Sequence, residues 1–202
     1  MQLEGRNLGL RYDGRWILRE ISITVREGER LGIIAPSGYG KTSLCKILAG
    51  YRRPTLGQVL LDGRVMDKKG VFPVQLVSQH PEQSINPRWR MREVLQEAGM
   101  LDSDALQLLG IETDWLSRYP NELSGGELQR FCVARAMCKG TRFLIADEIS
   151  AMLDVITQAQ IWEYLQKQAE AENMGMIVVS HSPSLLNRVC TKTVELEAIN
   201  RA

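Results

Sequence analysis

A glycine-rich segment between an apolar run and a helical pattern constrains this chain more than any other feature. The apolar run covers Arg30–Ala35, and the pattern after the glycines places Leu44, Ile47 and Leu48 at helical spacing before Gly50. The sequence therefore predicts a strand, a glycine loop and a helix in direct succession. This order is typical of α/β folds, in which helices pack back onto a sheet.

Further periodic segments extend the α/β interpretation along the chain. Runs typical of strands cover Leu18–Val25, Gln75–Ser78, Arg142–Ala146 and Met176–Ser180, and short strands between Thr55 and Val77 have turns at Asp62-Gly63 and Lys68-Lys69-Gly70. Helical patterns cover Met91–Ala98, Asp102–Leu109, Thr113–Tyr119, Gly125–Met137 and Ile156–Ala171, and Ser182-Pro183 is a helix start. We expect a mostly parallel sheet, an antiparallel β region near the N-terminus and an inserted α-helical subdomain.

This pattern predicts one domain over residues 1–202. Its core would comprise residues 1–80 and 140–202, and residues 81–139 would form the helical subdomain.

The charge composition bears on possible binding partners, because the 25 Lys and Arg residues nearly balance the 24 Asp and Glu residues. Without a basic field, nucleic acid is not an expected partner. The four cysteines lack metal-site spacing, which indicates reduced thiols in a cytosolic compartment, and no apolar run approaches the roughly 20 residues that span a bilayer.

The glycine segment itself, Ala35–Ser43, resembles the phosphate-binding P-loop, G-x-x-x-x-G-K-[ST], and extends the fold prediction to a P-loop (RecA-like) core. The candidate nucleotide ligands are Ser37, Gly38, Gly40, Lys41, Thr42 and Ser43. Loop N–H groups and Lys41 would bind the phosphates of ATP, and the Thr42 hydroxyl would bind Mg²⁺. Ala35 stands where glycine is usual, and a positive φ there would be strained. A simple glycine turn before a helix is the alternative.

Two acids end the apolar run Arg142–Ala146. Asp147 is the candidate ligand of Mg²⁺, and Glu148 is the candidate base that polarises an attacking water. Buried strands seldom end in unpaired carboxylates, because desolvating a charge is costly. A solvated strand end is the alternative if the pair is considered without the glycine loop.

The segment Leu123–Arg130, L-S-G-G-E-L-Q-R, resembles the signature L-S-G-G-Q-x-Q-R of ATP-binding cassette (ABC) ATPases, with Glu127 in place of glutamine. Ser124, Gly125 and Gly126 lie at a predicted helix start and would bind a γ-phosphate. A serine N-cap is the alternative. The resemblance implies a head-to-tail dimer, in which the signature of one subunit closes on the ATP held by the other.

Other positions match further elements of the same family. The resemblance assigns Gln79 to the Mg²⁺ ion and the attacking water, His181 to the γ-phosphate and Glu148, and Asp154 to the partner's P-loop. Considered alone, Gln79 would be a polar strand end and His181 a structural histidine. Tyr12 is the candidate for stacking on adenine, with Trp16 as its rival, and either ring is otherwise a core residue. Ala151 and Ile149 replace a usual serine and a usual proline.

The stretch Val77–Arg88 resembles V-F-Q-D-P-x-x-S-L-N-P of the oligopeptide, dipeptide and nickel importers. This resemblance implies an ATPase subunit that energises import of peptides, nickel or a metal chelate. Its partners would be a second ATPase subunit, identical or paralogous, transmembrane permease subunits and, indirectly, an extracytoplasmic binding protein. Pro81–Arg92 and the helical insert would receive a permease helix, which places the chain on the cytoplasmic face of the membrane. An exporter subunit and a soluble ABC ATPase are the alternatives.

Overall fold

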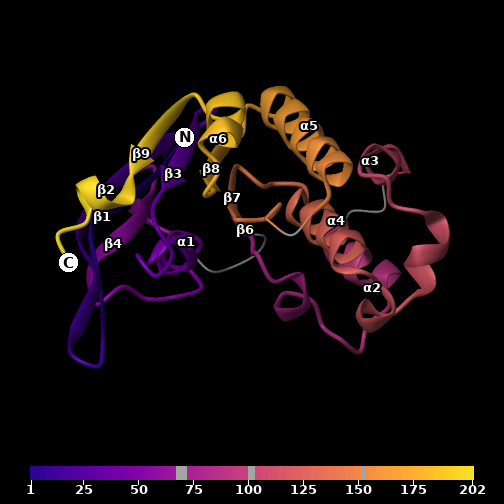
Figure 1. Ribbon diagram of the computed structural model, residues 1–202, viewed down its shortest axis with the longest axis horizontal. Helices are drawn as coiled ribbons and strands as arrows, with labels where there is room; N and C mark the ends of the chain where they lie inside the picture. Colours follow the sequence, from indigo (N-terminus) through magenta and orange to yellow (C-terminus); the bar gives the residue numbers. More distant parts are fainter. Residues whose placement is uncertain (67–71, 100–102, 152) are drawn as a thin grey trace.

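In the computed structural model the chain folds into two β-sheets and a group of helices (Figure 1). The structure describes residues 1–66, 72–99, 103–151 and 153–202. The turn expected at Lys68-Lys69-Gly70 lies outside the described residues, whereas the turn at Asp62-Gly63 is confirmed by φ values of 48° and 74°.

The antiparallel sheet has the strand order β2-β1-β4-β5. It comprises β1 (Gln2–Tyr12), β2 (Arg15–Arg26), β4 (Leu56–Leu61) and β5 (Arg64–Val65). The sequence patterns did not delimit β1, because shifts in its pairing with β2 break the two-residue alternation that marks a strand. Asp13 and Gly14 join β1 to β2 with φ values of 46° and 81°, as a two-residue hairpin turn requires.

The second sheet is parallel, with the order β6-β7-β8-β3-β9. Its strands are β6 (Val74–Val77), β7 (Phe143–Asp147), β8 (Gly175–Val179), β3 (Arg30–Ile34) and β9 (Lys192–Glu195). The helices that follow its strands include α1 (Lys41–Leu48), α5 (Val155–Ala171), α6 (Pro183–Val189) and α7 (Leu196–Ile199). The predicted fold class, a parallel core with an antiparallel β region, is confirmed.

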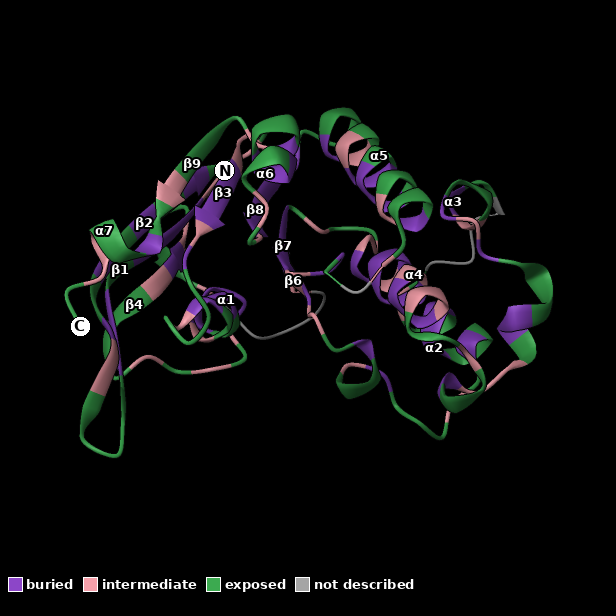
Figure 2. Cartoon of the chain, in the orientation of Figure 1, coloured by how far each residue is buried: buried purple, intermediate pink, exposed green. Residues whose placement is uncertain are grey.

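The parallel sheet separates two apolar cores. Leu144 and Ala146 of β7 face one core, and Phe143 and Ile145 face the other, because successive side chains of a strand point to opposite faces. β7 and β8 are buried throughout, which explains why each is a continuous apolar run in the sequence (Figure 2).

The segment between β6 and β7 is largely helical and lies on the opposite side of the molecule from β1, β2 and β4 (Figure 1). It contains α2 (Met91–Glu97), α3 (Ser103–Leu108) and α4 (Gly125–Ala136), together with the short 3₁₀ helices η1 (Pro81–Gln83), η2 (Thr113–Ser117) and η3 (Pro120–Glu122). The expected helix Thr113–Tyr119 is thus a 3₁₀ turn. It ends early because Tyr119 precedes Pro120 and is extended, with a ψ of 159°. The division into core and subdomain remains a prediction.

Among the described residues, no helix is both long and apolar enough to span a membrane.

Candidate nucleotide-binding site

Neighbouring strands of the parallel sheet deliver the predicted site residues to one edge. β6 leads to Gln79, β7 ends at Asp147 and leads to Glu148, β8 leads to His181, and β3 leads to the glycine loop. Ligands of open α/β sheets bind outside the carboxyl ends of the strands. Motifs far apart in the sequence therefore meet at the position where this fold binds its ligands.

The glycine loop is closed by its own lysine. Lys41 Nζ donates to the carbonyl oxygens of Ala35, at 2.8 Å, and Pro36, at 3.0 Å. Left-handed φ values occur at Gly38 and Gly40, 85° and 86°, whereas Ala35 has no positive φ. The strain considered for Ala35 is therefore absent, and its buried methyl group packs in the core. A Cβ added at Gly38 would meet nothing within 4 Å, so the loop is open to a phosphate there.

Glu148 lies between Lys41 and His181. Its Oε1 is 3.3 Å from Lys41 Nζ and 2.8 Å from His181 Nε2. Its backbone is left-handed, with a φ of 53°, and its N–H donates to the Val179 carbonyl of β8. A glutamate in this region is strained, and such strain gathers at functional sites. The left-handed backbone of Glu148 directs its carboxylate out of the sheet, toward Lys41 of the glycine loop.

Asp147 is 2% exposed and forms a hydrogen bond with the Thr42 side chain. Its Oδ1 has no hydrogen-bond partner among the described residues. Burial raises the pKa of Asp147, an effect that the Thr42 hydrogen bond opposes. A buried carboxylate oxygen without a partner fits a cation ligand.

The described residues contain no group of three or more His, Cys, Asp or Glu side chains able to hold a metal ion by themselves. Proteins usually bind Mg²⁺ through one or two carboxylates together with substrate phosphates, and buried Asp147 offers one such carboxylate. Thr42, Asp147 and Gln79 are the residues that would hold it.

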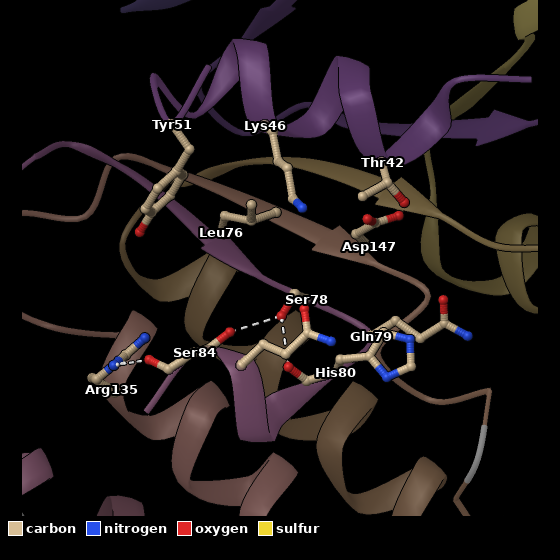
Figure 3. A pocket seen from close by; sticks show the side chains of 11 residues that line it. Thr42, Lys46, Tyr51, Leu76, Ser78, Gln79, His80, Ser84, Arg135 and Asp147 are labelled. Carbon is tan, nitrogen blue, oxygen red and sulfur yellow. Dashed lines mark hydrogen bonds between the residues drawn. The ribbon is translucent and has the colours of Figure 1, made fainter. Parts of the chain in front are cut away.

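Gln79 lines two adjoining cavities. One, of about 450 Å³, is formed with Tyr12, the glycine loop, Glu148 and His181. The other, of about 430 Å³, lies between α1 and the segment after β6 (Figure 3). In that view Thr42 and Asp147 face each other across from Ser78 and Gln79. Gln79 is thus half-buried at the junction of the predicted nucleotide site and the helical segment.

Tyr12 and Trp16 line different cavities beside the glycine loop. Tyr12 is 41% exposed, lines the cavity that contains Lys41 and packs its ring 4.3 Å from the Arg52 guanidinium. Trp16 is half-buried and borders another cavity, which Ser37, Gly38 and Tyr39 of the same loop also line. Both cavities border the glycine loop, but only the cavity of Tyr12 also contains Lys41, Glu148 and His181. This placement favours Tyr12 as the ring that stacks on adenine.

The predicted signature residues lie away from this cavity. Ser124 accepts from the Glu127 N–H and Glu127 accepts from the Ser124 N–H, which forms a reciprocal cap on α4. A Cβ at Gly125 would meet nothing within 4 Å, and one at Gly126 would lie 3.5 Å from Leu153. None of Ser124, Gly125 and Gly126 lines the cavity of the glycine loop. The two predicted phosphate sites of one chain therefore do not share this cavity.

Asp154 follows Leu153, the residue that lies beside Gly126, and it caps α5. Its Oδ1 accepts from the N–H groups of Ile156 and Thr157, at 3.0 and 2.9 Å. The preceding Met152 lies outside the described residues. Ile149, the departure from a usual proline, is 3% exposed and packs in the core shared with α4 and α5.

Sequence patterns missed Ser150 and Gln129. The Ser150 hydroxyl is buried and accepts from Gln158 and from the Trp162 indole at 3.1 Å, which ties the turn after Glu148 to α5. Gln129 is 2% exposed and donates to the Ser78 carbonyl, next to Gln79. The signal for Gln129 was its place in the signature pattern, whereas Ser150 had none.

Comparisons with known proteins give a consistent result. The family model described as "ABC transporter" matches residues 18–151, more than half of the chain. The chain belongs to the ABC transporter family. Nickel import system ATP-binding proteins NikE of two Staphylococcus aureus strains, bovine RF122 / ET3-1 and USA300, are each 34% identical to it. Each alignment covers 90% of this chain and 80% of the relative.

Solved structures agree with this ABC fold. An ATP-binding subunit of an ABC transporter superposes with a TM-score of 0.85 at 22% identity, covering 96% of this chain and 85% of the other. An ATP-binding cassette, solved as a dimer in a post-hydrolysis state with ADP and Pi, superposes with a TM-score of 0.83 at 23% identity, covering 96% and 93%. At these identities the likeness concerns the fold.

The pKa of Asp147 predicts the stability of an Asp147→Asn variant of this ABC protein. The folded-state pKa is raised above the ordinary 3.8, so ionisation of Asp147 destabilises the fold at neutral pH. This destabilisation disappears as the pH falls through the raised pKa. Asparagine removes the charge and still accepts from Thr42, so we expect the unfolding midpoint at pH 7, without nucleotide or Mg²⁺, to rise by about 2–4 °C.

Calorimetric scans at pH 7 and at mildly acidic pH measure this effect, and the gain should shrink on the acidic side. Asp13→Asn, in the exposed hairpin turn, is the control and should shift the midpoint little at either pH. A lower midpoint for Asp147→Asn at pH 7 would contradict the destabilising role of the buried charge.

Proposed function

We propose that this ABC protein binds ATP with Mg²⁺ and hydrolyses it to energise a membrane importer, with nickel or a nickel chelate as the transported substrate. The observation that carries the ATPase proposal is the juxtaposition of Lys41, Glu148 and His181 beside an open glycine loop. A lysine that neutralises phosphate charge, a carboxylate base and an imidazole are the groups that phosphoryl transfer to water requires.

Each residue of the site would have a separate role in ATP binding or hydrolysis. Ser37, Gly38, Gly40, Lys41, Thr42 and Ser43 bind the triphosphate, and Tyr12 stacks on adenine. Glu148 accepts the proton of the attacking water, and His181, within hydrogen-bonding distance of Glu148, orients that carboxylate and faces the γ-phosphate. Gln79 positions the water. Bound Mg²⁺ would neutralise phosphate charge, with Thr42, Asp147 and Gln79 as its protein ligands.

We further propose that the complete site forms between two ATPase subunits. The separation of Ser124–Gly126 and Asp154 from the glycine loop of the same chain supports this arrangement. The solved dimeric cassette of the same fold supports it as well. The partner is an identical or paralogous subunit, and a single chain should hydrolyse ATP slowly.

The import direction and the substrate rest on the NikE relatives and on the match at Val77–Arg88. Transmembrane permease subunits would bind beside Pro81–Arg92 and hold the chain at the cytoplasmic face of the membrane, and an extracytoplasmic binding protein would deliver the substrate. The division into an ATP-binding core of residues 1–80 and 140–202 and a helical subdomain of residues 81–139 belongs to the same proposal.

Uptake of ⁶³Ni²⁺ by cells that lack this chain tests the proposed transport. We expect accumulation to fall severalfold, and the wild-type chain, but not its Glu148→Gln variant, to restore it. Uptake of a labelled oligopeptide is measured in parallel to distinguish the two substrate classes. Higher nickel accumulation in the deletion would indicate export, and unchanged accumulation of both substrates would overturn the importer proposal.

A further inference from the structure

The segment after β9 returns to the edge of the antiparallel sheet beside the glycine loop. α7 (Leu196–Ile199) lies close to β2 and β9 (Figure 2), and Leu196 is fully buried in the core shared with β2 and α1. β2 is the edge strand of its sheet, because the order is β2-β1-β4-β5. Edge strands leave backbone N–H and C=O groups that need partners.

Asn200 supplies those partners at the start of β2. Its Nδ2 donates to the Ile17 carbonyl at 3.0 Å, and its Oδ1 accepts from the Arg19 N–H at 2.8 Å. The neighbouring Arg201 N–H donates to the Arg19 carbonyl at 3.1 Å. The amide side chain of Asn200 thus imitates the missing neighbouring strand over Ile17–Arg19.

Ile17 and Leu18 of β2 pack directly against the glycine loop. A Cβ built on Gly40 would lie 2.8 Å from Leu18 Cδ2 and 2.9 Å from Ile17 Cγ2. Ile17 also lines the cavity that contains Gly38, Lys41 and Glu148. Any displacement of Ile17 therefore changes the wall of that cavity and the space available to the loop at Gly40, where α1 begins.

We propose that Asn200 is a positioning residue for nucleotide binding, which acts by holding Ile17 and Leu18 against the glycine loop. This inference rests on the proposed ATP binding. Asn200 lies outside every motif of the nucleotide site. It lines the cavity of Trp16, which Ser37 and Gly38 also border, and its hydrogen bonds to β2 are the contacts through which it acts. Exposed ion pairs such as Arg201–Glu20, at 3.1 Å, contribute little to this attachment compared with the two amide hydrogen bonds.

Titration of the 202-residue chain with ATP and Mg²⁺ tests the role of Asn200. We expect Asn200→Ala to weaken ATP binding about three- to tenfold, because two hydrogen bonds that order the wall are lost. Asn200→Asp keeps the shape and the bond to the Arg19 N–H but places an anion against the Ile17 carbonyl, and it should weaken binding at least threefold on the same grounds. Asn187→Ala, an exposed change on α6, is the matched control and should leave the Kd unchanged.

Steady-state kinetics of the assembled transporter separate positioning from mere structural support. We expect the KM for ATP to rise with the Kd while kcat stays within about twofold, because ground-state binding alone is affected. A lower unfolding midpoint with an unchanged Kd in both Asn200 variants would overturn the proposal. If the wild-type chain itself does not bind ATP, the failure lies in the proposed function.

Discussion

The Glu148→Gln variant should bind ATP and lose turnover by at least about 100-fold, the range expected for removal of a general base. Glutamine preserves the size of the side chain and still accepts from His181, but it cannot take a proton from water. The left-handed backbone, with a φ of 53°, places the side chain and is retained, because it depends on the Glu148 N–H bond to Val179.

The neutral glutamine also weakens the contact with Lys41, which lies 3.3 Å from the same Oε1 in the wild type. Lys41 is then more available to the phosphates, so ATP binding should be no weaker than in the wild type. With hydrolysis blocked, ATP should hold two chains together. Phosphate release measures turnover, and size-exclusion chromatography with ATP detects the dimer.

Glu163→Gln provides the matched control for this change, because Glu163 is exposed on α5 and lines neither cavity of the site. It should retain wild-type turnover. Unchanged turnover in Glu148→Gln would show that another group is the base.

The Ser124→Arg variant is expected to leave ATP binding by the isolated chain intact and to lower turnover of the assembled complex by about 100-fold, as the loss of a transition-state contact does. Ser124 lies outside the cavity of its own glycine loop, so an arginine there does not touch the nucleotide bound by the same chain. In a head-to-tail dimer the same arginine would occupy the space of the γ-phosphate bound by the partner.

Gln107→Arg adds the same charge to an exposed position of α3 and should change neither property. Calorimetric ATP titration of the isolated chain and phosphate release by the complex are the two measurements. Loss of ATP binding in the isolated Ser124→Arg chain would show that the signature residues act within one subunit.

The structure answered two questions that substitutions in the motifs had raised. Ala35 is accommodated because the loop takes its left-handed conformations at Gly38 and Gly40, so a methyl group at position 35 causes no strain. Ile149 is accommodated because its side chain is buried between the parallel sheet and the neighbouring helices. Neither departure therefore disrupts the geometry around Glu148.

The sequence by itself determined the α/β class and the candidate residues of the site. These features are written locally: apolar strand runs, helical periods, a glycine loop and acids at a strand end each occupy a few consecutive residues. Once the strands are parallel, the residues at or just after their carboxyl ends share one edge of the sheet. These residues are Gln79, Asp147, Glu148 and His181.

Tertiary structure alone decided which surfaces lie together and which remain apart. Pairings between distant segments, such as Asn200 with Ile17 and Ser150 with Trp162, leave no periodic signal in either segment. The strain at Glu148 is likewise imposed by its bond to β8 and not by the residue itself. The sequence specifies the chemical groups, whereas long-range packing sets the distances at which they act.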